Sequence, residues 1–120
     1  MRVVNEVLMA PSDASVNQTS RPAIIDHSWG YAIQILITGT ATGTVGLQGS
    51  CDPGPNANFQ AANDPAVVNW TDIAGSSQAV TGAGTVTYDV VKTAYPWVRV
   101  VYTASSGIGT IAAHFNAKGL

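Results

Sequence analysis

The chain has few charged residues and a single cysteine. Asp, Glu, Lys and Arg make up 10% of the 120 residues, against about 25% in an average soluble domain. The five basic residues are scattered and the net charge is −2, so no basic cluster could neutralise several phosphates. We therefore expect no direct nucleic-acid partner. Because Cys51 is the only cysteine, the chain can form neither an intrachain disulfide nor a cysteine-based metal site. We expect Cys51 to pack as a small apolar group or to remain an inert thiol.

Long apolar runs are missing as well. No segment approaches the roughly 18 consecutive apolar residues that cross a bilayer, so we expect no membrane partner. The opening residues, MRVVNEVLMA, are interrupted by Asn5 and Glu6, unlike the apolar region of a secretory signal. We expect synthesis in a cytoplasm.

Recognisable catalytic motifs are also absent. His27 and His114 are the only histidines, and neither lies in a metal-ligand spacing. No G-x-S-x-G elbow or phosphate-binding loop occurs. The acidic residues Asp52, Asp64 and Asp72 fit turns better than a calcium loop. We predict no enzyme, no catalytic or metal-binding residue and no cofactor.

Short alternating segments fill most of the chain instead. Residues 29–40 alternate apolar and polar positions with the period of two that a strand requires, and so do residues 85–90 and 97–103. No segment repeats apolar residues at helical spacing. We predict an all-β fold, a single-domain antiparallel β-sandwich or a jelly-roll-like variant of it. Eight residues should share its core: Ile33, Ile35, Ile37, Val45, Leu47, Val98, Val100 and Ile111.

A phrase of small hydroxylated residues and glycines occurs twice, as ITGTATGTVGLQGS (residues 37–50) and YTASSGIGTIAAHF (residues 102–115). Thr and Ser suit a pleated strand, and Gly accepts the positive φ of tight turns. Both phrases are therefore predicted to be β-hairpins. Residues 51–67, rich in proline, should form a long loop between them.

The N-terminal segment is expected to be separate from the sandwich. Residues 1–21 are interpreted as a strand or arm followed by a flexible link, and residues 22–120 as the β-sandwich domain. A terminal strand can pair with its own sheet or with the exposed edge of a neighbour, and we favour the neighbour. The residues expected to make this assembly contact are Val3, Val4, Val7 and Leu8.

Two further features have open alternatives. The aromatic residues Trp29, Tyr95 and Trp97 could form a platform that stacks on sugar rings, or they could fill the core. Arg99, inside the apolar run WVRVVY, could lie on a solvated sheet face or pair with a carboxylate such as Asp89, because an unpaired buried guanidinium is prohibitive.

Four segments together resemble small virion-associated proteins of tailed bacteriophages: GTVGLQGSCDP, NWTDIAGSS, YPWVRVVYTASSGIGTI and the final FNAKG. Their order is more specific than any one of them. Cys51 stands where a polar turn residue is expected, and the loop at residues 53–67 is long for the group. The motifs shared with this group are Asp-Ala-Ser at residues 13–15, Thr-Gly-Thr at 42–44, Leu-Gln-Gly-Ser at 47–50 and Trp-Thr-Asp-Ile at 70–73. They continue with a strand at residues 95–103 and a final Gly-Thr-Ile at 109–111.

The resemblance implies a non-enzymatic structural component of a virion, a capsid decoration or head-associated protein made in the host cytoplasm. Its partners would be copies of itself and other virion or capsid proteins. The alternative from another class is a β-sandwich module that binds carbohydrate or a host surface.

Overall fold

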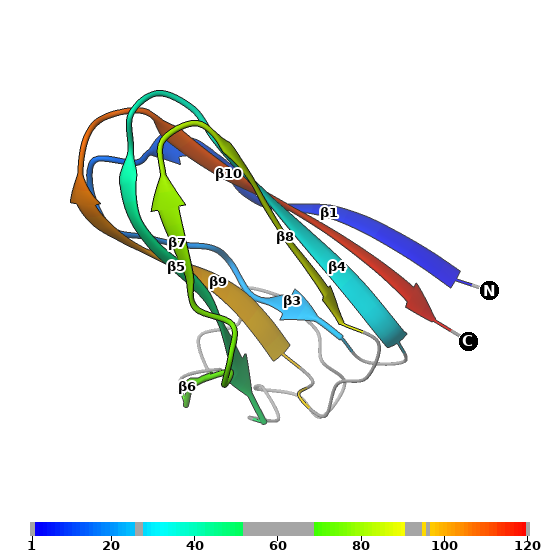
Figure 1. The fold of residues 1–120 in the computed structure, drawn as a ribbon. Coiled ribbons are helices and arrows are strands. Elements are labelled where there is room, and N and C mark those ends of the chain that lie inside the picture. Colours follow the sequence, from blue (N-terminus) through cyan, green and yellow to red (C-terminus); the bar gives the residue numbers. More distant parts are fainter. Residues whose placement is uncertain (1, 26–27, 52–68, 91–94, 96, 120) are drawn as a thin grey trace.

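The structure, a computed structural model, describes residues 2–25, 28–51, 69–90, 95 and 97–119. Within these residues all regular structure is β, and ten strands form two antiparallel sheets. The sheets pack face to face as two layers (Figure 1). The predicted all-β, single-domain sandwich is confirmed.

The two sheets differ in regularity. Sheet A has four strands, in the order β1-β10-β4-β8: β1 Arg2–Asp13, β10 Thr110–Gly119, β4 Ser28–Ile37 and β8 Gly84–Val90. In sheet B, β9 and β5 are the two central strands, and two short strands lie on each outer side. On β9 these are β2 and β3, and on β5 they are β6 and β7. The strands of sheet B are β2 Gln18–Thr19, β3 Ala23–Ile24, β5 Thr42–Ser50, β6 Thr71–Asp72, β7 Gln78–Thr81 and β9 Trp97–Ser106.

Of the connections that pass from one sheet to the other, four lie wholly within the described residues. They join β1 to β2, β4 to β5, β7 to β8 and β9 to β10, so the order β1, β10, β4, β8 in sheet A corresponds to β2, β9, β5, β7 in sheet B. We call these connections arches, and Figure 1 shows them gathered at one end of the molecule. Paired sheets joined in this order form a jelly roll, which decides between the two predicted variants.

The hairpin prediction for the repeated phrases is wrong. Each phrase spans an arch, with one strand in sheet A and one in sheet B. Hairpins and arches have the same alternation and the same turn residues. They differ in strand pairing: here β4 pairs with β10 and β5 pairs with β9, so the two strands of one phrase do not pair with each other. The two arches also bond to each other: the Thr38 and Thr40 amides donate to the Thr110 and Ile108 carbonyls at 2.9 and 2.7 Å. The phrase occurs twice because two adjacent arches both need Gly in their turns and Thr or Ser in the flanking strands.

The predicted core is confirmed. All eight of its residues are 5% exposed or less, and they lie on the inner faces of four long strands. Val101 is apolar as well, so the sequence also allows the opposite face of β9 to be buried; in the structure Val101 is half-buried and points away from Val100. The alternation therefore assigned these eight side chains to the correct face.

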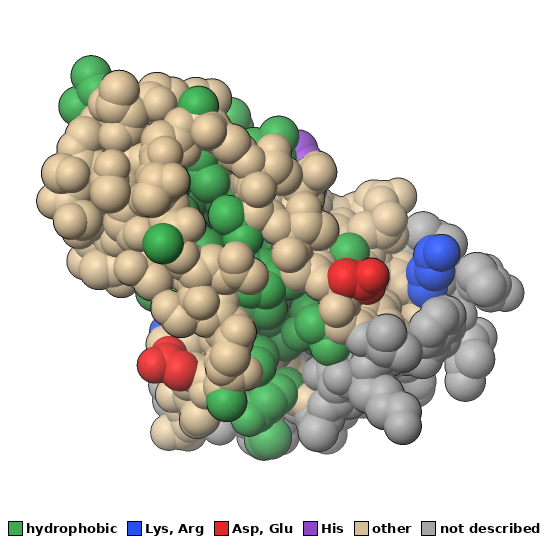
Figure 2. All heavy atoms as spheres, viewed as in Figure 1, with side chains coloured by type: hydrophobic (Ala, Val, Ile, Leu, Met, Phe, Trp, Pro, Cys, Tyr) green, Lys and Arg blue, Asp and Glu red, His purple; other side chains and the backbone are tan. Residues whose placement is uncertain are grey.

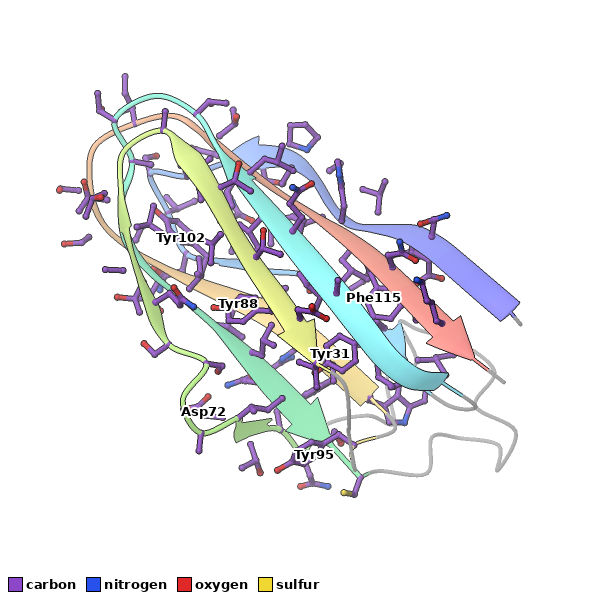
Figure 3. The ribbon with its side chains drawn as sticks, turned by 45° about the vertical axis from the view of Figure 1, so that its right-hand side comes forward. Tyr31, Asp72, Tyr88, Tyr95, Tyr102 and Phe115 are labelled. Carbon is purple, nitrogen blue, oxygen red and sulfur yellow. The ribbon has the colours of Figure 1, made fainter. Side chains whose placement is uncertain are left out.

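Two tyrosines span the space between the layers (Figure 3). The Tyr88 hydroxyl, from sheet A, donates to the Ser76 carbonyl at 2.6 Å, and the Ser76 hydroxyl accepts from the Leu47 amide at 3.0 Å. The Tyr102 hydroxyl, from sheet B, donates to the Ala14 carbonyl in the β1–β2 arch at 2.9 Å. Each hydroxyl thus satisfies a backbone carbonyl that would otherwise be costly to bury.

Tyr88 should make the protein sensitive to alkali. Burial raises the pKa of Tyr88 from 10.0 to about 12, so the unfolded chain loses this proton first. The stabilisation is complete below about pH 10 and declines as the pH rises toward 12. Tyr88→Phe should cost about 1–3 kcal/mol at neutral pH, because the Ser76 carbonyl loses its donor. Urea unfolding should also show a smaller decline between about pH 9 and pH 11 for the variant than for the native protein. Identical declines would contradict this role.

The N-terminal segment belongs to sheet A. It pairs with β10 from Arg2 to Asp13. The flexible link, which the Pro- and Ser-rich residues from Ala10 onward led us to expect, is therefore wrong for residues 10–13. Leu8 and Met9 are both buried, at 3% and 6% exposure, around a register shift between Val7 and Met9. Leu8, predicted to contact a neighbour, therefore packs in its own core.

The other three predicted arm residues, Val3, Val4 and Val7, also lie in β1, and their positions do not test a contact with a neighbour. Val7 is 51% exposed and sits opposite His114. Val3 and Val4 are paired by their backbones with Lys118 and Ala117. An assembly role for this segment stays a prediction.

Candidate functional site

Four side chains meet on the outer face of sheet B. Gln48 of β5 lies opposite Arg99 of β9 on one side and opposite Asp72 of β6 on the other. Paired residues in an antiparallel sheet point to the same face, so all three point away from the core. Trp70, just before β6, completes the group. We call Gln48, Trp70, Asp72 and Arg99 the outer-face cluster.

The cluster is bonded from end to end. Gln48 Nε2 donates to Asp72 Oδ1 at 2.8 Å, and Arg99 Nε donates to Gln48 Oε1 at 2.8 Å. The Arg99 guanidinium carbon lies 4.3 Å from the centroid of the Trp70 ring, which is cation–π distance. Because both ends of the Gln48 amide are engaged, its orientation is fixed. Figure 3 shows Asp72 at the side of the molecule where β5 and β6 run together.

In the contacts of the outer-face cluster, Arg99 binds the neutral Gln48 amide and the Trp70 ring and no carboxylate. Its side chain is half-buried, and this burial lowers the pKa of Arg99, although a guanidinium remains charged at physiological pH. The suggested pairing with Asp89 is wrong, because Asp89 is an outward residue of β8 in the other sheet. The solvated-face alternative is closer, but the Gln48 amide and the Trp70 ring both hold the guanidinium.

Sequence reasoning missed this cluster. Its members are far apart in the chain, 24 residues between Gln48 and Asp72 and 51 between Gln48 and Arg99. The available signal was that Gln48 and Arg99 are outward polar positions in alternating segments. Three of the segments in the phage-protein resemblance, LQGS, WTDI and the WVRVVYT strand, each contribute to the cluster.

An open hollow of about 330 Å³ lies beside the cluster. Thr44, Thr103 and Asp72 provide polar groups along it, and Gly46 and Val101 provide a small, apolar floor. Hydroxyl and carboxylate oxygens around an apolar floor suit a polar partner that also brings some apolar surface.

The outer face of sheet A carries two adjoining hollows, of about 540 and 460 Å³. Both include Ala32, Thr87 and Asn116, so together they form one shallow trough. His114 lies in it and is exposed. The amide and hydroxyl groups of Gln34, Thr87 and Asn116 offer hydrogen bonds there, beside the charged Glu6, Asp89 and Lys118.

The structure also places the residues considered for metal binding and catalysis. Across the described part of the chain, no three His, Cys, Asp or Glu residues are grouped so that they could hold a metal ion. His27, Asp52 and Asp64 lie outside the described residues. Asp72 is in strand β6 and binds Gln48, so its predicted turn role is wrong.

Of the three aromatic residues considered for a sugar platform, Trp97 fits the core alternative. Trp97 is fully buried and cannot stack on a sugar. Tyr95 is half-buried and packs on the core with its ring over Gly49, where an added Cβ would lie 2.5 Å from the ring. The side chain of Trp29 lies outside the described part. Cys51 is exposed, so of its two predicted roles, packing as an apolar filler is wrong.

Comparisons with known proteins identify the fold. No protein-family model and no curated protein sequence matches the chain. No helix in the described residues is long and apolar enough to span a membrane. The crystal structure of SPBc2 prophage-derived protein YomS is similar over 96% of this chain and 93% of that chain, with a TM-score of 0.54 and 10% identity.

Two other solved structures match with TM-scores of 0.47. One concerns Bacillus endospore appendages described as a novel family of disulfide-linked pili, at 16% identity over 98% of this chain and 89% of that chain. The other is the structure of infectious bursal disease virus Gx strain, at 12% identity over 98% of this chain and 32% of that chain. At these identities the likeness to the prophage-derived protein establishes a shared β-sandwich fold.

Proposed function

We propose that the protein is a non-enzymatic structural component of a bacteriophage virion, a capsid decoration or head-associated subunit. It acts through contacts with identical subunits and with other virion proteins. The observation that carries the proposal is the outer-face cluster, because segments that resemble phage virion proteins converge on it from three parts of the chain.

The chemistry of the cluster suits a protein contact. Trp and Arg are enriched among the few residues that dominate interface energies. Here the Arg99 guanidinium is already fixed by Gln48 and stacked on Trp70. A partner that covers the cluster would therefore immobilise few additional side-chain torsions, which lowers the entropic cost of association.

The fold and the composition support the same class. Jelly rolls are found in viral capsid domains and in lectins, and a prophage-derived protein shares this fold. Fold alone does not determine function. Only 10% of the residues are charged, however, so few charged groups lose their hydration when a neighbouring subunit covers the surface.

Particle binding tests the proposal. The protein should be detected by mass spectrometry in purified virions of the source phage, and added protein should rebind to particles stripped of it. Arg99→Ala should weaken rebinding about tenfold or more, as expected for an interface hot spot. Lys118→Ala removes a positive charge from the exposed face of sheet A and should rebind like the native protein.

Thermal melting must first show that both variants are folded. Absence of the protein from purified virions would refute the virion role. Equal rebinding of the two variants would refute the cluster as the contact.

The second candidate is binding of carbohydrate or a host surface. It is favoured by the hollow beside the cluster, whose Thr44, Thr103 and Asp72 oxygens could bond sugar hydroxyls. The Trp70 ring belongs to the adjoining cluster. A glycan array would separate the two functions. Saturable binding that Trp70→Ala abolishes would support this candidate, and the absence of glycan binding would leave the assembly function.

A further inference from the structure

The edges of the two sheets are protected very unequally. A free strand edge can pair with another chain, and proteins usually block it with short strands, proline, bulges or charge. In sheet B, β2, β3 and β6 have two residues each, and β7 has four. These edges are too short to pair extensively.

Strand β1, at one edge of sheet A, is long but irregular. It contains Pro11 and two register shifts. The backbone and side chain of Arg21 also bond to it, with the amide donating to the Leu8 carbonyl at 3.3 Å and Nε donating to the Val7 carbonyl at 3.2 Å. This edge is therefore kinked and partly occupied.

Strand β8, at the opposite edge, has no proline and no register shift, and Asp89 is its one charged residue. Its seven residues, GTVTYDV, include no proline, lysine or arginine, and they pair with β4 without a register shift. Its free side has no paired strand among the described residues.

An apolar strip adjoins this edge. Figure 2 shows hydrophobic side chains exposed between the two sheets on the side where β7 and β8 lie. Val86 and Val90 of β8 and Ile73, beside β6, are packed against the core but only partly buried. A partner strand on β8 would cover apolar side chains as well as backbone groups.

The ladder fixes which residues of β8 face outward at the edge. Thr38 donates its amide to Thr110, one position beyond the Ile37–Ile111 pair of β4 and β10. Bonded pairs alternate along an antiparallel ladder, so Ile35 and Ile33 bond to β8 instead of β10. They pair with Val86 and Tyr88. The backbone groups on the free side are therefore those of the intervening residues, Thr85, Thr87 and Asp89.

We propose that β8 pairs with β8 of a second copy of this chain, antiparallel across a twofold axis at Thr87, to give a continuous eight-stranded sheet. This inference rests on the proposed function only in that both require contacts between subunits. The axis sets Thr87 opposite Thr87 of the second copy and Asp89 opposite Thr85. About six backbone hydrogen bonds would form, because each of the three facing pairs exchanges two.

Side chains favour this register over its neighbours. Val86 comes to lie opposite the second copy's Tyr88 on the inner face, a β-branched and aromatic pair of the kind that stabilises sheets. The two Asp89 carboxylates are kept about 13 Å apart by four residues of strand, farther than the screening length at physiological salt. An axis at Asp89 would instead bring the two carboxylates directly opposite each other.

Backbone blocking provides the first test. Thr87→Pro removes an amide on the free side and leaves the bonds to β4 in place, because an edge strand tolerates proline there. Thr87→Ser keeps the amide. Light scattering after gel filtration should give a dimer for the native protein and Thr87→Ser, and a folded monomer for Thr87→Pro.

Cross-linking tests the register. In a Cys51→Ser background, Thr87→Cys should form an intermolecular disulfide in most chains under mild oxidation, because facing bonded residues are about 5.5 Å apart at Cα. Thr85→Cys should cross-link only a small fraction, because the two copies of residue 85 would be about 13 Å apart.

A monomeric native protein, a dimeric Thr87→Pro or equal cross-linking at both positions would overturn the proposal. If Thr87→Pro is a folded monomer but the protein is missing from virions, the pairing stands and the virion role fails.

Discussion

Replacing Gly107 with alanine is expected to destabilise the protein by more than about 3 kcal/mol. Gly107 lies in the β9–β10 arch with φ at 81°, a conformation that costs an L-residue about 1–2 kcal/mol. An added Cβ would also overlap the Thr40 carbonyl oxygen of the neighbouring β4–β5 arch. The two arches would have to separate, although Thr40 donates its amide to Ile108 at 2.7 Å. Urea unfolding with circular dichroism measures the loss.

Alanine substitutions at two other glycines distinguish the cost of a positive φ from the cost of steric overlap. Gly75 has φ at 79° but no atom within 4 Å of an added Cβ, so Gly75→Ala should cost about 1–2 kcal/mol. Gly84 has neither a positive φ nor a close neighbour, so Gly84→Ala should change stability by less than about 0.5 kcal/mol. If Gly107→Ala costs no more than Gly75→Ala, close packing of the arches contributes nothing.

The arches also show where sequence reasoning ends. The period of two in β4, β5, β9 and β10 depends only on which side of each strand is buried, and it assigned the core correctly. It contains no information about which sheet a strand joins. Pairing of β5 with β9 joins segments about 55 residues apart in sequence. Glycine-rich turns were therefore read as hairpins when they were arches.

The N-terminal strand illustrates a second limit. Leu8 and Met9 are adjacent, yet both are buried, because the register shift between Val7 and Met9 interrupts the alternation. A strict period of two cannot place both residues inside. The terminal position and the polar Asn5–Glu6 centre favoured an arm, and neither feature indicates this register shift.

The candidate site depends on register more than on composition. One of the two alternatives for Arg99 was a carboxylate partner such as Asp89, which is nearer in the chain than its actual partner Gln48. Once β5 and β9 are aligned, Gln48 and Arg99 are directly opposite, and the side-chain bond follows. The same alignment fixes Asp72 on the other side of Gln48. Polar residue types were visible in the sequence, but their proximity was not.

The register of β4 can be tested by shortening two adjacent side chains. Ile35 is fully buried and lies between Val86 of β8 and Ala113 of β10 on the inner face of sheet A. Close packing on both sides limits how far the core can collapse around a cavity, so Ile35→Ala should cost about 2–5 kcal/mol. Leu36 is the next residue, of equal size, and its half-buried side chain points to the outer face. Leu36→Ala should cost about 1 kcal/mol or less. Chemical denaturation of both variants gives the comparison directly. Equal losses, or a larger loss at Leu36, would mean that β4 presents the opposite face to the core, because a slip of one residue exchanges the two sides.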